Sequence, residues 1–106
     1  VLHRDLKSLN VLIFNDWTAT LCDFGFAELN SWTTSTMSKQ GKVIGTYNWT
    51  APEVIRDEHP KKTPPANVYS TGMVIYEILS TKVPLAEHTL LKVARAVTEQ
   101  QRPSVP

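Results

Sequence analysis

An acid, two cations and an amide lie close together near the start of the sequence. Asp5 is flanked by Arg4 and Lys7, whose positive charges favour its ionised form, so its carboxylate can orient a hydroxyl group or accept its proton. Asn10 and, further along, Asp23 offer the hard oxygen ligands that Mg²⁺ prefers when it bridges phosphates. This set of residue types predicts phosphoryl transfer.

Three motifs follow one another in an order that is typical of one enzyme family. Residues 3–10 read H-R-D-L-K-S-L-N, residues 23–25 read D-F-G, and residues 51–53 read A-P-E. With this order and spacing the chain resembles the eukaryotic protein kinases over essentially its whole length. The resemblance implies ATP and Mg²⁺ as cofactors and a protein as the phosphoryl acceptor.

The resemblance also assigns a role to each residue of these motifs. Asp5 would orient the substrate hydroxyl and take its proton, and Lys7 would stabilise the charge on the transferred phosphoryl group. Asn10 and Asp23 would hold Mg²⁺, so that ATP would be bound by Lys7, Asn10 and Asp23. In the same motifs, His3, Phe24 and Gly25 would have structural roles.

Two features resemble serine/threonine kinases rather than tyrosine kinases. Lys7 stands two residues after Asp5, and Thr46 stands where serine/threonine kinases use a threonine to bridge the catalytic aspartate and lysine. Residues 45–53 read G-T-Y-N-W-T-A-P-E, which is most similar to the tyrosine-kinase-like group, the Raf and mixed-lineage relatives. Thr50 departs from that pattern, because the group typically has methionine there.

Residues 26–44 are rich in Ser, Thr, Asn, Gln and Gly and have little periodicity, which predicts an exposed loop. This loop resembles the kinase activation segment, in which Arg4 would receive a phosphate. A solvated polar loop without phosphorylation is the alternative, since Glu28 occupies a place where family members often carry a basic residue. The candidate phosphate acceptors are Thr33, Thr34, Ser35, Thr36 and Ser38.

The hydropathy pattern predicts a β-hairpin and two helices. Apolar, β-rich runs at residues 11–14 and 17–22 flank a polar turn, which predicts a hairpin that delivers Asn10 and Asp23 to one place. Residues 66–80 are apolar on nearly every face, which predicts a buried helix preceded by a Thr63 cap. Residues 88–100 predict an amphipathic helix. We expect its apolar face to comprise Leu90, Leu91, Ala94 and Val97.

Two further contacts of charged or polar residues are expected to hold the fold together. Glu53 is expected to be largely buried and paired with Arg102, which matches the family arginine that supplies this partner. At the start of the predicted central helix, related kinases have an aspartate that accepts hydrogen bonds from the catalytic loop. This chain has Asn67 there, which still accepts through its carbonyl oxygen but carries no charge.

The fold class that these patterns predict is α+β and mainly helical, a kinase-like large, C-terminal lobe with a small β-hairpin at the catalytic loop. The 106 residues are shorter than a kinase domain, so residues 1–106 are expected to form part of one, without the small lobe and the last helices. The isolated chain is therefore expected to bind ATP weakly. A non-catalytic interaction module, or pseudokinase, is the alternative, motivated by Asn67 and by the absent small lobe.

The composition and charge of the chain indicate which kinds of partner and compartment to expect. The net charge is +1 with both signs interspersed, which argues against a nucleic-acid partner. No apolar run approaches the length needed to span a bilayer. Cys22 is the single cysteine, which excludes an internal disulfide and favours a reducing, cytoplasmic compartment. Beside Asp23, this thiol is expected to be a small buried side chain rather than a reactive one.

Overall fold

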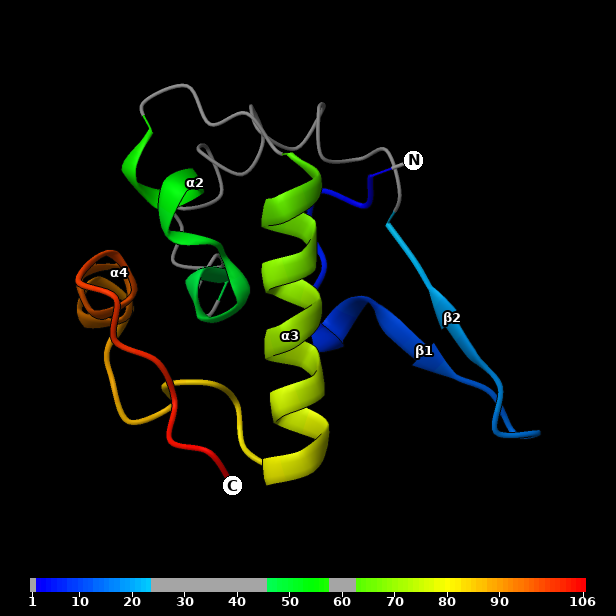
Figure 1. Cartoon of the computed structure of the whole chain (residues 1–106). Helices are drawn as coiled ribbons and strands as arrows, with labels where there is room; N and C mark the ends of the chain where they lie inside the picture. The colour runs from blue at the N-terminus through cyan, green and yellow to red at the C-terminus, as the bar shows by residue number, and fades with distance from the viewer. Residues whose placement is uncertain (1, 24–45, 58–62) are drawn as a thin grey trace.

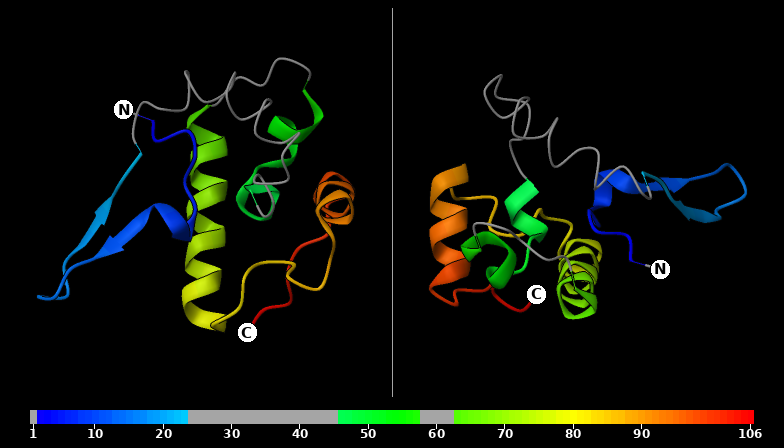
Figure 2. Two further views of the ribbon diagram at one scale, coloured as in Figure 1. Left: turned by 180° about the vertical axis from the view of Figure 1, so that it is seen from behind. Right: turned by 90° about the horizontal axis from the view of Figure 1, so that it is seen from above.

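The computed structural model describes residues 2–23, 46–57 and 63–106 of the chain (Figure 1). A central helix separates two regions, which both views in Figure 2 show on opposite sides of it. The α+β, mainly helical class that the sequence predicts is confirmed. The elements are η1 (Ser8–Asn10), β1 (Val11–Ile13), β2 (Ala19–Leu21), η2 (Thr46–Trp49), α2 (Pro52–Arg56), α3 (Pro64–Ser80) and α4 (Leu90–Thr98).

The predicted hairpin is present as the antiparallel strands β1 and β2. Their register pairs Val11 with Leu21 and Ile13 with Ala19. The Asp16 carboxylate stabilises the turn, because its Oδ1 accepts hydrogen bonds from the Thr18 backbone N–H at 3.0 Å and the Thr18 hydroxyl at 2.7 Å. These two bonds lower the pKa of Asp16. Asx turns of this kind close short hairpin loops.

Helix α3 begins where its sequence predicts. The Thr63 hydroxyl oxygen accepts a hydrogen bond from the Ala66 N–H at 3.4 Å, and two prolines occupy the first helical turn. Proline suits this turn because its missing N–H would have no partner inside the helix. The helix ends at Ser80, because the next residue, Thr81, has a left-handed φ of 57° that stops the helical run.

The prediction that α3 is buried on every face is wrong. Ala66 is its buried residue, and several of its large apolar side chains are exposed. Among the described residues, Ser8 of η1 bonds to Glu77 of α3, and η2 packs against the same helix, but these contacts leave part of its apolar surface uncovered. The exposed side chains are Val68, Ile75, Ile78 and Leu79, which are 51–70% accessible.

The apolar core lies on the other side of α3 from the hairpin, between α2, η2 and α4. Leu85, Val93, Ala96 and Val97 are almost fully buried and pack together. Ile55 of α2 and Tyr69 of α3 are partly buried and pack against this cluster, which joins three helices. Burial of such side chains contributes roughly 1.5–3 kcal/mol each for the larger ones.

The amphipathic helix is present as α4, but its buried face differs from the predicted one. Val93, Ala96 and Val97 face the core, whereas Leu91 is 81% exposed. Residues three and four apart share a face of a helix, and position 91 is two residues from position 93, which places it almost opposite. The prediction that Leu91 packs onto the protein is therefore wrong.

The described helices include none that is both long and apolar enough to cross a bilayer. The predicted loop at residues 26–44 lies outside the described residues.

Candidate functional site

The catalytic-loop motif is anchored by a buried histidine. His3 is 2% exposed, and its Nε2 lies 2.6 Å from the Cys22 carbonyl oxygen. Its Nδ1 accepts a hydrogen bond from the Asp5 N–H at 3.3 Å. Because Nδ1 accepts, Nε2 must carry the proton and donate to Cys22. One imidazole ring therefore ties the backbone at Asp5 to the end of strand β2, just before Asp23.

Three of the predicted site residues lie together in this loop. The Lys7 Nζ is 3.5 Å from Oδ2 of Asp5. The Asn10 amide nitrogen donates to the Asp5 carbonyl oxygen at 2.7 Å and lies 3.5 Å from Oδ2 of the same residue. Both charged side chains stay partly exposed, at 19% for Lys7 and 34% for Asp5, so the Asp5 carboxylate is accessible from outside. The arrangement suits a carboxylate that holds a hydroxyl group beside a cation.

The hairpin brings Asp23 next to this group, as the sequence predicts. The Cys22 N–H donates to the Asn10 carbonyl oxygen at 2.9 Å, so the start of β1 and the end of β2 are paired. Asp23 follows Cys22 with a left-handed φ of 60°, and its side chain is exposed. Asp23 and Asn10 are thus presented at the same end of the hairpin.

Asn10 and Asp23 form a donor set that fits Mg²⁺. The amide nitrogen of Asn10 is engaged with Asp5, so its carbonyl oxygen is the atom of that side chain suited to a cation. Asp23 adds a carboxylate, and hard oxygen ligands completed by water are what Mg²⁺ prefers. Across the described ranges, no cluster of three or more His, Cys, Asp and Glu residues gathers for a metal.

The start of α3 touches the catalytic loop through Asn67. Its Oδ1 accepts a hydrogen bond from the Arg4 N–H at 3.4 Å, and Arg4 has a left-handed φ of 72°. The contact joins the first turn of α3 to residues 3–10, as expected for Asn67. A neutral acceptor forms a weaker hydrogen bond than a carboxylate, by roughly 1 kcal/mol.

The expectation that Glu53 is buried and paired with Arg102 is wrong. Glu53 is exposed in the first turn of α2, and no Arg102 ion pair is found in the described part of the chain. Arg102 instead lies over the Tyr69 ring at 5.1 Å and donates to the carbonyl oxygens of Val97 and Gln101. These contacts engage the Arg102 guanidinium group, and the exposed Glu53 carboxylate stays in water. Neither charged group therefore bears the free-energy cost of full desolvation.

Tyr69 lies between these two charges. Partial burial raises the pKa of the Tyr69 phenol, the Arg102 cation lowers it, and the Glu53 carboxylate raises it further. Burial is the largest of the three effects, because it penalises the charged phenolate. Tyr69 therefore packs in the core as a neutral side chain.

Sequence reasoning missed a set of polar residues that connect the site to α3. Both carboxylate oxygens of Glu77 accept hydrogen bonds, from the Ser8 hydroxyl at 2.9 Å and from the Trp49 indole N–H at 3.0 Å. The sequence did contain a signal for this contact, because Glu77 is the single charged residue in the apolar α3 sequence. Charged side chains are rarely placed in such a segment without a partner.

Several predicted residues lie outside the described part of the chain. Thr46 opens η2, but its side chain is not described. The remaining ones are Phe24, Gly25, Thr33, Thr34, Ser35, Thr36 and Ser38.

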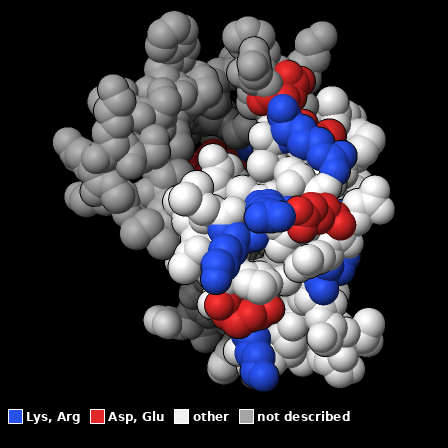
Figure 3. All heavy atoms as spheres, turned by 90° about the vertical axis from the view of Figure 1, so that its left-hand side faces the viewer, with Lys and Arg blue, Asp and Glu red and all other residues white. Residues whose placement is uncertain are grey.

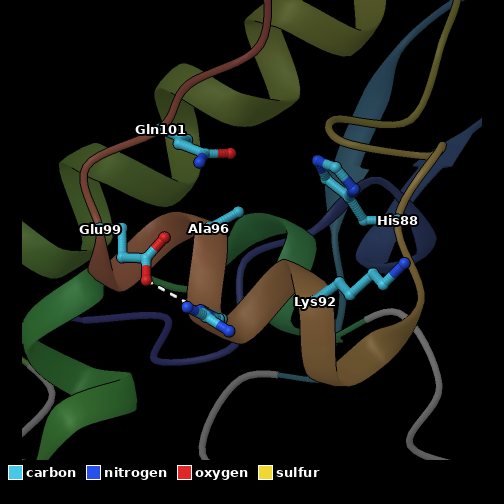
Figure 4. A pocket seen from close by; sticks show the side chains of 6 residues that line it. His88, Lys92, Ala96, Glu99 and Gln101 are labelled. Atoms are coloured by element: carbon cyan, nitrogen blue, oxygen red, sulfur yellow. Dashed lines mark hydrogen bonds and ion pairs between the residues drawn. The ribbon is translucent and has the colours of Figure 1, made fainter.

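A hollow of about 190 Å³ lies beside α4 (Figure 4), and α4 is on the other side of α3 from the hairpin (Figure 1). It is shallow, and its Arg95 and Glu99 pair with each other at 2.8 Å. Figure 3 shows positive and negative side chains interleaved over this face. The residues around the hollow are His88, Lys92, Arg95, Ala96, Glu99 and Gln101.

The family model of the protein kinase domain matches residues 1–105. A serine/threonine-protein kinase/receptor of Acanthamoeba polyphaga mimivirus is 41% identical over 106 residues, which are 100% of this chain and 6% of that protein. The Raf homolog serine/threonine-protein kinase of Caenorhabditis elegans is 42% identical over 88 residues, 79% of this chain and 11% of that protein.

Serine/threonine-protein kinase CTR1 of Arabidopsis thaliana is 36% identical over 97 residues, 92% of this chain and 11% of that protein. The chain therefore spans a small part of the length of each of these relatives. The predicted resemblance, including the similarity to Raf relatives, is confirmed. The chain belongs to the protein kinase family.

Proposed function

We propose that this chain carries the catalytic loop and metal-binding residues of a serine/threonine protein kinase. Asp5 orients the substrate hydroxyl and accepts its proton, and Lys7 stabilises the negative charge on the transferred phosphoryl group. The observation that carries the proposal is that the Asp5 carboxylate lies 3.5 Å from the Lys7 ammonium group, while the Asn10 amide donates to the Asp5 backbone carbonyl oxygen at 2.7 Å. A carboxylate that lies beside a cation and whose backbone is held in place is suited to position a hydroxyl group for attack.

Protein kinases use ATP and Mg²⁺, and the residues of this chain fit both. When bound, Mg²⁺ would neutralise phosphate charge, and Asn10 and Asp23 would hold it. His3 supports this arrangement, because its two hydrogen bonds fix the distance between the Asp5 backbone and the end of β2. Lys7 would bind the phosphate of ATP that is transferred.

Thr46 would bridge Asp5 and Lys7 from the beginning of η2. The proposal is supported by the position of η2, which packs against the same helix, α3, that supports the catalytic loop. The relatives are named serine/threonine-protein kinases, which supports serine and threonine as acceptors. Phosphorylation among Thr33, Thr34, Ser35, Thr36 and Ser38, with Arg4 as the receiving cation, stays a prediction.

We further propose that residues 1–106 act within a larger kinase domain, as part of its large lobe. The exposed apolar side chains of α3 and of the hairpin support this, since soluble domains rarely leave so many uncovered. Small-lobe residues that clamp adenine and phosphates are not recognisable in this sequence, so the isolated chain is expected to bind ATP weakly.

The test is transfer of the terminal phosphate of ATP by the full-length protein to a generic protein substrate, with and without Mg²⁺. Phosphate on serine or threonine, dependent on Mg²⁺, is the expected result. A protein that transfers no phosphate but still binds partner proteins would instead support the pseudokinase function that Asn67 suggests. Phosphate found on tyrosine alone would contradict the proposed acceptor.

A further inference from the structure

A single carboxylate joins two segments that are far apart in the sequence. Oε1 of Glu77 accepts a hydrogen bond from the Ser8 hydroxyl at 2.9 Å, and Oε2 accepts one from the Trp49 indole N–H at 3.0 Å. Glu77 lies on α3, and Figure 1 shows η1 and η2 on either side of this helix. Both oxygens of the side chain are thus used, one toward each segment.

The first segment belongs to the proposed catalytic loop. Ser8 follows Lys7 and opens η1, which ends at Asn10. Lys7 contacts the Asp5 carboxylate, and Asn10 contacts the Asp5 backbone and lies near its carboxylate. A bond that fixes Ser8 therefore restricts the short stretch of backbone on which these side chains are carried.

The second segment is η2, which begins at Thr46 and ends at Trp49. Trp49 is 4% exposed, so its indole N–H needs an acceptor within the protein. Its carbonyl oxygen accepts a second bond from α3, from the Ser70 hydroxyl at 2.7 Å. Helix α3 thus holds Trp49 at both its side chain and its backbone.

The chemistry of the bridge requires a carboxylate. Ser8 and Trp49 both present donors to Glu77, and an ionised carboxylate is the side chain that accepts at two oxygens. Hydrogen bonds to a charged acceptor are about twice as strong as neutral ones. Glutamine has the same shape, but its NH₂ group would face one of the two donors, so one bond would be lost.

We propose that Glu77 is a positioning residue that couples the catalytic loop to η2 and so holds the backbone that carries Lys7 and Asn10. This inference rests on the proposed function, because it concerns the same site. Glu77 does not touch the reacting atoms; it acts through Ser8 and Trp49. Loss of the bridge should therefore lower the rate of phosphoryl transfer beyond any loss of folded protein.

The experiment measures kcat/KM for a protein substrate in the full-length protein and in variants that remove one donor each, Ser8→Ala and Trp49→Phe. Ser8→Ala removes the hydroxyl alone, and Trp49→Phe removes the indole N–H together with one ring. In the protein that keeps Glu77, the fold-loss in kcat/KM of the double variant should be smaller than the product of the two single fold-losses. The reason is that each single change already breaks the bridge. Glu77→Gln should lower kcat/KM by about tenfold and abolish this non-additivity.

Thr71→Val serves as the matched control on α3, because the Thr71 hydroxyl bonds within the helix, to the Asn67 carbonyl oxygen. It should change kcat/KM less than about twofold. If Ser8→Ala and Trp49→Phe combine multiplicatively, the coupling is refuted, even if Glu77→Gln fails to fold. An unaltered protein that transfers no phosphate would refute the proposed function instead, which separates the two failures.

Discussion

The two sides of α3 are built from different interactions. In residues 2–23, the buried side chains are those of His3 and Asn10, which are both polar and both hydrogen-bonded. On the other side, the buried cluster around Val93 and Val97 is apolar. Apolar burial is strong but not directional, whereas hydrogen bonds fix the positions of particular atoms.

This difference separates the residues that stabilise the fold from those that set the geometry of the candidate site. The apolar side holds α2, α3 and α4 together, and the polar side sets the distances among Asp5, Lys7 and Asn10. Substitutions on the apolar side should therefore lower stability first. Substitutions on the polar side should lower phosphoryl transfer more than their effect on stability explains. Four changes test this division, from the largest expected effect to the smallest.

Leu85→Ala should have the largest effect on stability. Leu85 is 5% exposed in the core cluster, and removing such a side chain leaves a cavity that costs about 2–5 kcal/mol of unfolding free energy. Leu91→Ala is the matched control, because Leu91 is 81% exposed and should cost no more than about 0.5 kcal/mol. Thermal unfolding of the full-length protein measures both, and equal losses would remove the basis for a core at this position.

His3→Phe should affect both stability and activity. The ring keeps its approximate size, but the Cys22 carbonyl loses its donor and the Asp5 N–H its acceptor, at a cost of about 1–3 kcal/mol. Phosphoryl transfer per folded molecule should also fall, since the link between Asp5 and Asp23 is broken. His88→Phe, at a partly exposed histidine near α4, should leave that rate unchanged. Equal rates for both variants would show that His3 does not position the site.

Asn67→Asp should strengthen the link between α3 and the catalytic loop by about 1 kcal/mol, because the Arg4 N–H would then donate to a charged acceptor. Asn48→Asp should have the opposite sign. Asn48 is buried and donates to the Pro84 carbonyl oxygen at 2.6 Å, and a carboxylate has no hydrogen to donate. Melting temperatures that move in the same direction for both variants would contradict these assignments.

The smallest effect concerns the pH dependence at Tyr69. Burial raises its pKa, so above about pH 10 the unfolded chain ionises first and binds fewer protons than the folded one. Stability should therefore decline as the pH rises through that range. Arg102→Met should raise the pKa of Tyr69 further, because the Arg102 cation lowers it. Ultraviolet titration of tyrosinate, with Tyr69→Phe as the reference, measures the shift, and a lowered value would overturn the assignment.

Local patterns in the sequence predicted the hairpin and the helices α3 and α4. The apolar, β-rich runs on either side of a polar turn at Asp16 predicted the hairpin, and Thr63 followed by two prolines marked the beginning of α3. The hairpin in turn explained how Asn10 and Asp23 reach the same end of the hairpin. These features depend on residues that are close together in the sequence, so they could be predicted from it.

Features that depend on distant contacts were harder to predict. An apolar composition indicated that α3 is buried, but burial depends on which segments cover each face, and Val68 and Ile78 are open. Arg102 was expected to pair with Glu53, yet the Tyr69 ring lies within reach of its guanidinium group. Glu77 was missed because its two partners, Ser8 and Trp49, become neighbours only after folding.

The central claim is that Asp5 positions and deprotonates the substrate hydroxyl, and Asp5→Ala in the full-length protein tests it most directly. The rate of phosphate transfer from ATP to a protein substrate is measured together with the melting temperature. The account predicts a loss of at least about 100-fold in rate while the protein stays folded at the assay temperature, because general-base catalysis contributes about 10²–10⁴-fold. A folded Asp5→Ala variant with a rate near that of the unaltered protein would contradict it.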